Sequence, residues 1–247
     1  LYQENRWDFC ILTNIPVTSL TGRLLKDIMG HRPFQAEISQ VCPYIPLPDQ
    51  IEVFYSSLSR NRRNTIMRRR RNLQKNYNGF ELVKCKNSDE IDDAMERLFK
   101  LHQKKWIEVK HKGNFARNQI RDFHKRVAGT FLNTDMLGLY FLRVQGKDVA
   151  ALYTFKYNNK LFYYQGGWDP EWYKDRVGSI LTNLVIEDAI NRGYSEYDFL
   201  RGTEDYKIRL TDKKREEMDI FILNSFNSRI YLLFRNLYHK IKGFSQL

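Results

Sequence analysis

The chain has 247 residues, of which 42% are hydrophobic and 14% aromatic. This composition excludes an intrinsically disordered chain and allows a folded core that needs no disulfide or metal support. The formal net charge of +12 implies anionic partners, without choosing among phosphorylated metabolites, membrane surfaces and nucleic acid.

The cysteines and the apolar runs give expectations about the cellular setting. Cys10, Cys42 and Cys85 are far apart and form no CxxC pair, so we expect reduced thiols and no metal site. No apolar run approaches the roughly 20 residues that a membrane span requires, and no hydrophobic leader is visible. We therefore expect a cytoplasmic protein, with peripheral contact at the inner face of a membrane left open. The leucine at position 1 is compatible with a fragment of something longer.

Hydrophobic periodicity and breaker residues predict the elements in chain order. Up to the glycine at 79 we expect a strand, a helix, a strand, a proline-rich stop and one long helix, at 7–12, 18–29, 34–42, 42–48 and 50–77. A strand and two helices follow, at 80–85, 89–109 (capped by Ser88) and 115–131. Three runs joined by short turns predict an antiparallel meander, at 136–144, 149–157 and 160–168. The remainder is predicted as a helix, a strand, a loop or helix start, a strand and a basic helix, at 176–192, 195–200, 201–207, 218–223 and 226–242.

This succession of elements predicts an α/β fold with a mixed sheet. The expected parts are an N-terminal segment, an arginine-rich connecting helix, a core and a basic amphipathic C-terminal helix, at 1–48, 49–78, 79–225 and 226–247.

The run RNRRNTIMRRRRNLQK, residues 60–75, carries seven arginines. On a helical wheel for one continuous helix, Arg62 and Arg69 fall within the apolar seam, and the other five lie at its edge or point away. Because an unpaired buried charge is costly, we expect Arg62 and Arg69 either to pair with structural carboxylates or to bind a phosphate or carboxylate of a substrate.

The stretch from 162 to 179 contains the first candidate binding groups. Gly166 and Gly167 follow a strand and permit a bulge or a close backbone approach to a ligand. The segment DRVGS opens a helix with Gly178 and Ser179 in its first turn, where free N–H groups and the helix dipole favour a phosphate, and Arg176 adds charge. Ordinary helix capping is the alternative interpretation.

The segment YDFLRGTEDYK, residues 197–207, places charged and phenolic groups just after a strand. Ligands of α/β sheets bind at the carboxyl ends of strands, so these side chains could act as base, acid or oxyanion stabiliser. A salt-bridged loop is the alternative. No Gly-x-Ser-x-Gly elbow, P-loop or HExxH motif occurs, so serine hydrolases, P-loop nucleotide hydrolases and zinc peptidases have no support.

The ordered combination of LSRNRRNTIMRRRRNLQK, LFKLHQKKW and YYQGGWDPEWYKDRVGS with YDFLRGTEDYK resembles the GNAT-superfamily acetyltransferases associated with cellulose and exopolysaccharide biosynthesis, over about residues 43–223. That family is similar in turn to the Fem-type peptidyltransferases. The resemblance implies a GNAT-like acyl-CoA N-acyltransferase fold at 79–225, with a mixed, largely antiparallel central sheet flanked by helices. It also implies that the N-terminal segment is the remnant of a second, Fem-like domain.

The resemblance implies transfer of an acyl group, in the first place acetyl, from acyl-CoA to an amine or hydroxyl of an anionic or sugar-containing acceptor of the cell envelope or of polysaccharide metabolism. The implied catalytic residues are Lys207, Tyr206, Asp198 and Glu204. The implied cofactor-binding residues are Arg176, Val177, Gly178, Ser179 and Ile180. The implied substrate-binding residues are Arg62, Arg69, Tyr164, Gln165, Gly166, Trp168 and Arg201.

The phosphate loop departs from the usual GNAT pattern at two positions. Where that pattern has Gln or Arg first and Gly or Ala last, this chain has Asp175 and Ile180. Asp175 would repel a pyrophosphate unless Arg176 offsets its charge.

Two other functions stay open at this point. An aminoacyl-tRNA-dependent transferase would use the outward arginines to meet RNA, whereas DNA is not expected as a partner. A non-catalytic membrane or assembly factor would use the amphipathic C-terminal helix as an interfacial helix.

Overall fold

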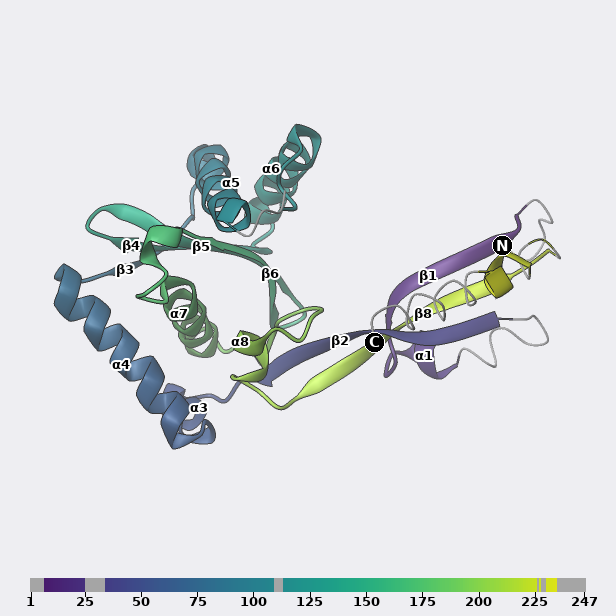
Figure 1. Ribbon diagram of the computed structural model, residues 1–247, viewed down its shortest axis with the longest axis horizontal. Helices are drawn as coiled ribbons and strands as arrows, with labels where there is room; N and C mark the ends of the chain where they lie inside the picture. The colour runs from purple at the N-terminus through teal and green to yellow at the C-terminus, as the bar shows by residue number, and fades with distance from the viewer. Residues whose placement is uncertain (1–6, 25–33, 109–112, 226, 228–229, 235–247) are drawn as a thin grey trace. The chain divides into compact units, whose positions relative to one another are not determined.

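The computed structural model describes residues 7–24, 34–108, 113–225, 227 and 230–234 (Figure 1). The chain forms two compact units, a larger one at Pro43–Lys213 and a smaller one made of residues 1–42 and 214–247. This division differs from the expected parts because β8 (Lys214–Leu223), which we assigned to the core, pairs antiparallel with β1 (Phe9–Pro16). Among the described residues, no helix has the length and apolar character needed to cross a membrane.

The larger unit is built on a mixed sheet with the strand order β2-β7-β6-β5-β4-β3. Its strands are the part of β2 (Phe34–Pro46) from Pro43 onwards, β3 (Glu81–Lys84), β4 (Leu137–Val144), β5 (Lys147–Tyr157), β6 (Lys160–Trp168) and β7 (Glu196–Asp198). Neighbours in this order are antiparallel except β6 and β7, which are parallel. The predicted meander and the mixed, largely antiparallel α/β fold are therefore confirmed.

The prolines at 42–48, expected to stop regular structure and to mark a linker or domain edge, do not stop the strand, because β2 continues through Pro43 to Pro46. The boundary between the two units does fall there, at Pro43. Proline has no backbone N–H, so it is tolerated in a strand at positions where the N–H would not form a hydrogen bond within the sheet. The carbonyl of Pro43 accepts from the Phe199 N–H at 3.0 Å, so this residue still joins the sheet through its acceptor.

Helices cover both faces of the sheet in the larger unit (Figure 1). They are α3 (Ile51–Ser57), α4 (Arg60–Tyr77), α5 (Ile91–Glu108), α6 (Asn118–Asn133), α7 (Val177–Asn191) and α8 (Asp205–Ile208), with short 3₁₀ turns η1 (Ser88–Glu90) and η2 (Pro170–Trp172). Figure 1 shows α5 and α6 on one face, and α7 with α4 beyond it on the other. Buried side chains such as Leu98 and Phe99 of α5 and Val185 and Ile186 of α7 fill the two layers.

The single helix expected at 50–77 is two helices, because the chain becomes extended at Leu58. Ser59 then starts α4 as its N-cap, with its Oγ accepting from the Arg62 N–H at 3.4 Å. Arg62 lies in the first turn of α4, at the end of the helix, and its side chain is exposed, so its expected inward orientation is wrong. Arg70, expected to point away, instead donates to Glu187 Oε1 of α7 at 2.7 Å. Arg69 does face α7, as expected.

Replacing Arg70 with alanine should lower the free energy of unfolding by about 2 kcal/mol, because it leaves the Glu187 carboxylate without its cation. The side chains of Arg70 and Glu187 are only 16% and 17% exposed, and Tyr55 Oη donates to the same carboxylate oxygen at 2.6 Å. The measurement is urea unfolding, with Arg62→Ala on the exposed face of the same helix as the control. An equal loss in both variants would contradict this account of α4.

The smaller unit contains β1, β8 and the first part of β2 in the order β1-β8-β2, with the short helix α1 (Leu20–Arg23). Met218, Ile220 and Ile222 of β8 form its buried cluster. The predicted helix at 18–29 extends beyond the described residues, as does most of the predicted C-terminal helix at 226–242.

Candidate active site

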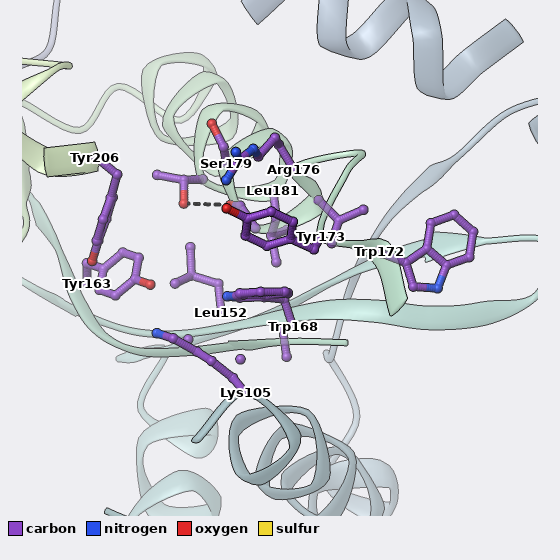
Figure 2. Close-up of a pocket in the computed structure, with 16 residues that line it drawn as sticks. Lys105, Leu152, Tyr163, Trp168, Trp172, Tyr173, Arg176, Ser179, Leu181 and Tyr206 are labelled. Carbon is purple, nitrogen blue, oxygen red and sulfur yellow. Dashed lines mark hydrogen bonds between the residues drawn. The ribbon is translucent and has the colours of Figure 1, made fainter. Parts of the chain in front are cut away.

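A cavity of about 280 Å³ lies in the larger unit, beside the edge of β6 (Figure 2). Strand β6 pairs with β7 only from Lys160 to Phe162, so within the described chain its later residues present an open edge on that side. The cavity is lined by Lys105, Ala151, Leu152, Tyr163, Gly166, Gly167, Trp168, Trp172, Tyr173, Arg176, Val177, Gly178, Ser179, Leu181, Thr182 and Tyr206. Strand β6, helix α7 and the ends of α5 and α8 therefore meet at one site.

A β-bulge in β6 determines which side chains face this cavity. Opposite β5, Thr154 pairs with Tyr163 and Tyr153 pairs with Gln165, so Tyr164 is an extra residue. A bulge of one residue shifts the alternation of side chains along the strand. Tyr163 and Trp168, which would lie on opposite faces of a regular strand, consequently both line the cavity.

The bulge separates the four residues that we predicted on β6 as substrate-binding. Gly166 and Trp168 line the cavity, whereas Tyr164 and Gln165 do not. The Tyr164 ring packs 5.3 Å from that of His124 on the α6 side of the sheet. Burial lowers the pKa of His102 of α5 and the Gln165 side chain raises it by a smaller amount, so Gln165 lies on the α5 side of the sheet. Alternation in the sequence contains no signal for the extra residue, which is why Tyr163 was missed.

Gly167 allows α5 to lie directly on β6. A Cβ at this position would be 2.2 Å from the backbone nitrogen of His102 and 2.5 Å from its Cα, distances that no side chain can occupy. This close approach lets Lys105, one turn further along α5, reach the cavity, as Figure 2 shows.

The N-terminus of α7 presents free N–H groups at the cavity. Arg176 is the N-cap residue, and its carbonyl accepts from the N–H groups of Ser179 and Ile180 at 2.9 and 3.1 Å. The N–H groups of Val177 and Gly178 have no partner among the described residues, and both residues line the cavity. Arg176 adopts a left-handed conformation with φ of 56°, which costs an arginine about 1 kcal/mol. Predicted residue Ile180 points into the core instead.

Two arginines lie at this helix start without a carboxylate partner in the described part of the chain. Arg69 of α4 donates to Ser179 Oγ at 3.2 Å, and the Arg176 guanidinium lies 4.3 Å from the centre of the Tyr173 ring. Burial, and next the Arg176 charge, lower the pKa of Arg69. Positive charge therefore accumulates beside free N–H groups, an arrangement that favours a bound anion.

Asp175, which the sequence suggested would repel such an anion, is engaged elsewhere. Its Oδ2 accepts a hydrogen bond from Tyr77 Oη at the end of α4, at 3.0 Å. The Tyr77 ring also packs 4.6 Å from Trp172.

Four of the predicted residues after β7 lie away from the cavity wall. Lys207 is only 3% exposed, and its Nζ donates to the Arg201 carbonyl at 2.7 Å and lies 2.8 Å from Glu204 Oε2. Asp198 is buried, and its Oδ1 accepts from the Leu200 N–H at 2.7 Å. Arg201 and Glu204 are exposed. These contacts hold the loop between β7 and α8 in shape.

Tyr206 is the residue of that segment which lines the cavity, together with Tyr163 of β6. Their ring centres are 6.1 Å apart, and Figure 2 shows the two rings next to each other at the cavity. Burial raises the pKa of Tyr163 to about 12, and burial together with the Tyr163 phenol also raises the pKa of Tyr206. Both phenols are therefore neutral near pH 7 and can donate a proton or a hydrogen bond.

Lys105 is a cavity residue that the sequence did not indicate. Burial lowers its pKa, the Glu204 carboxylate opposes this change and Lys207 adds to it. Lys104 and Lys105 are adjacent in the segment LFKLHQKKW, but Lys104 forms an ion pair with Asp169. Only the packing of α5 on β6 determines which of the two lysines reaches the cavity. Within the described ranges, no group of three or more His, Cys, Asp or Glu side chains could hold a metal ion.

Comparisons with solved structures show the fold of the chain. A conserved protein of unknown function from Bacteroides thetaiotaomicron is 14% identical with a TM-score of 0.58, covering 86% of this chain and 69% of that one. The C-terminal DUF2156 domain of a protein from Agrobacterium fabrum described as a lysylphosphatidylglycerol synthetase is 10% identical with a TM-score of 0.59, covering 90% and 70%. L-PGS from Bacillus licheniformis is 10% identical with a TM-score of 0.56, covering 93% and 73%.

Comparisons with sequences show the family. No curated protein sequence matches the chain. The family described as acetyltransferase (GNAT) domain matches residues 60–208, which is more than half of the chain and contains α4, the β4 to β6 meander, α7 and Tyr206. The chain therefore belongs to the family of acetyltransferase (GNAT) domains.

Proposed function

We propose that the protein transfers an acyl group, in the first place acetyl, from acyl-CoA to an amine or hydroxyl of a cell-envelope or polysaccharide-related acceptor. The observation that carries this proposal is the pair of arginines without carboxylate partners, Arg69 and Arg176, beside the free N–H groups of α7 and an aromatic cavity. The resemblance to polysaccharide-associated acetyltransferases supports the class of acceptor.

The donor would bind with its pyrophosphate at the start of α7. The N–H groups of Val177 and Gly178 and the guanidinium groups of Arg69 and Arg176 offer the donors that a pyrophosphate needs. From there the thioester arm would enter the cavity, whose walls include apolar Leu152. The bound pyrophosphate would then supply the negative charge that neither guanidinium group finds in the described part of the chain.

The open edge of β6 would bring the thioester close to the two phenols. The acceptor's lone pair forms a bond to the thioester carbonyl carbon, and the carbon–sulfur bond then breaks with its electron pair moving to sulfur. The acceptor's proton leaves to solvent, and the CoA thiolate takes a proton from Tyr206, which solvent replaces. The raised pKa of Tyr206 keeps its phenol protonated near pH 7, so this proton is present when the sulfur leaves.

Arg69→Ala and Arg176→Ala should each raise the dissociation constant of acetyl-CoA by about tenfold or more, because each removes a charge-assisted hydrogen bond to phosphate. Isothermal titration calorimetry measures this directly. Arg71→Ala is the matched control, since this exposed arginine lies on α4 outside the cavity lining, and its effect should be less than twofold at moderate salt. A wild-type protein that binds neither acetyl-CoA nor CoA would contradict the proposed function.

Arg176→Gly separates binding from folding at the same position. Glycine adopts the left-handed conformation without strain, which offsets the lost contact of the guanidinium with Tyr173. Weaker acetyl-CoA binding with an unchanged melting temperature would therefore assign the effect to the guanidinium charge.

A further inference from the structure

Lys105 brings a further positive charge to the cavity, from a different element than the arginines. It comes from α5, whereas Arg69 and Arg176 come from α4 and the start of α7. Figure 2 shows its side chain reaching from α5 towards Tyr163. The cavity therefore has an anion-binding arrangement at α7 and a separate cation at the tyrosine pair.

The described chain does not neutralise this lysine. Lys105 forms no ion pair among the described residues, and its Nζ lies 5.2 Å from the centre of the Trp106 ring. The nearby carboxylate of Glu204 lies 2.8 Å from Lys207 Nζ and is shared with that buried lysine. Within the described chain, Lys105 and Lys207 therefore have one nearby carboxylate between them, and its ion pair is with Lys207.

The contrast with the preceding residue makes the orientation of Lys105 informative. Lys104 has a counter-ion, Asp169, although its side chain is 40% exposed and could stay in water. Lys105 is half-buried against the cavity wall and has none. A partly desolvated cation without a partner is costly unless a ligand supplies the negative charge. The lowered pKa of Lys105 reflects the same desolvation.

We propose that Lys105 binds a carboxylate carried by one of the two substrates of the cavity, with the Tyr163 hydroxyl as a second hydrogen-bond donor. A single ammonium beside a phenol suits a monoanion such as a carboxylate better than a phosphate, for which several cations are usual. The carboxylate belongs either to the free end of the acyl group or to the acceptor. This inference rests on the proposed function and specifies its substrate class.

The first arm of the test examines the donor. Succinyl-CoA and butyryl-CoA carry four-carbon acyl groups that differ only in a terminal carboxylate, and their dissociation constants would be compared in wild type, Lys105→Gln and Lys105→Glu. If the acyl group carries the carboxylate, wild type should bind succinyl-CoA about tenfold more tightly than butyryl-CoA, and both variants should lose that preference. Lys100→Gln, an exposed lysine of the same helix outside the cavity, should retain it.

The second arm examines the acceptor. Glycine, alanine and glutamate would be compared with glycinamide, alaninamide and glutamine by thermal shift in the presence of CoA, in the same four proteins. If the acceptor carries the carboxylate, wild type should favour the more acidic member of each pair, and Lys105→Glu should abolish or reverse that order. Comparing each pair between wild type and variant removes the intrinsic chemical difference between an acid and its amide.

The outcomes separate the two claims. A carboxylate preference in one arm that disappears in the Lys105 variants supports the inference and names its source. Binding of acyl-CoA with no such preference in either arm overturns the inference and leaves the proposed function intact. If wild type binds none of the CoA esters, the proposed function fails first and the inference falls with it.

Discussion

Replacing Gly167 with alanine is expected to destabilise the protein by about 3 kcal/mol or more, which corresponds to a fall in melting temperature of about 10 °C. The new Cβ would lie 2.2 Å from the His102 nitrogen and 2.5 Å from its Cα and from the Leu101 carbonyl carbon. These are backbone atoms of α5, so no side chain can rotate away and the whole helix must move. That movement would open the core that Leu98 and Phe99 fill, and differential scanning calorimetry would record it.

The control for this substitution in β6 is a glycine of a helix, Gly129. Gly129 of α6 has no atom within 4 Å of an added Cβ, so Gly129→Ala should instead raise stability by about 0.5 to 1 kcal/mol through helix propensity. A melting temperature for Gly167→Ala within 2 °C of wild type would show that α5 does not depend on this contact.

Replacing Tyr206 with phenylalanine should lower kcat by about 100-fold while leaving the affinity for acetyl-CoA almost unchanged, because general acid catalysis contributes about that much. The ring would still pack near Tyr163 and Phe199, and only the proton donor would be lost. The rate of CoA release in the presence of acceptor measures kcat, and calorimetry measures donor affinity. A fall in affinity equal to the fall in kcat would assign Tyr206 to binding instead of catalysis.

The pH dependence of kcat gives this prediction a second readout. The raised pKa of Tyr206 keeps its phenol protonated above pH 10, the ordinary pKa of tyrosine. Loss of this proton therefore cannot lower kcat on the alkaline side below that pH. Tyr173→Phe is the matched control, since Tyr173 lines the same cavity and its ring would still support Arg176. We expect its kcat to stay within twofold of wild type.

The long periodic elements were predictable from the sequence. The meander at 136–168 and the helix at 176–192 were correct to within a few residues, because their hydrophobic patterns repeat over many positions. The break before α4 was not predictable from periodicity, since Leu58 and Ser59 fit a continuous helix as well as a helix end and a cap. The break leaves Arg62 in the first turn of a new helix, where its side chain is exposed.

The candidate site was predictable where its groups are local in sequence. Gly178 and Ser179 at a helix start, and Tyr206 after a strand, line the cavity as their positions suggested. Lys105 and Tyr163 reach the cavity through the packing of α5 on β6 and through the bulge, which depend on contacts between distant segments. No pattern within either segment reports such contacts.

The extra residue at Tyr164 has a consequence for comparing this chain with its relatives. Beyond that point each position of β6 faces the opposite side from the one that simple counting along the strand would give. An alignment that places a gap one residue too early or too late would equate a cavity residue such as Trp168 with a residue buried under α5. Transplanting side chains between homologues is therefore safe only when the alignment is anchored on this residue, and a single deletion there would be far more damaging than most substitutions.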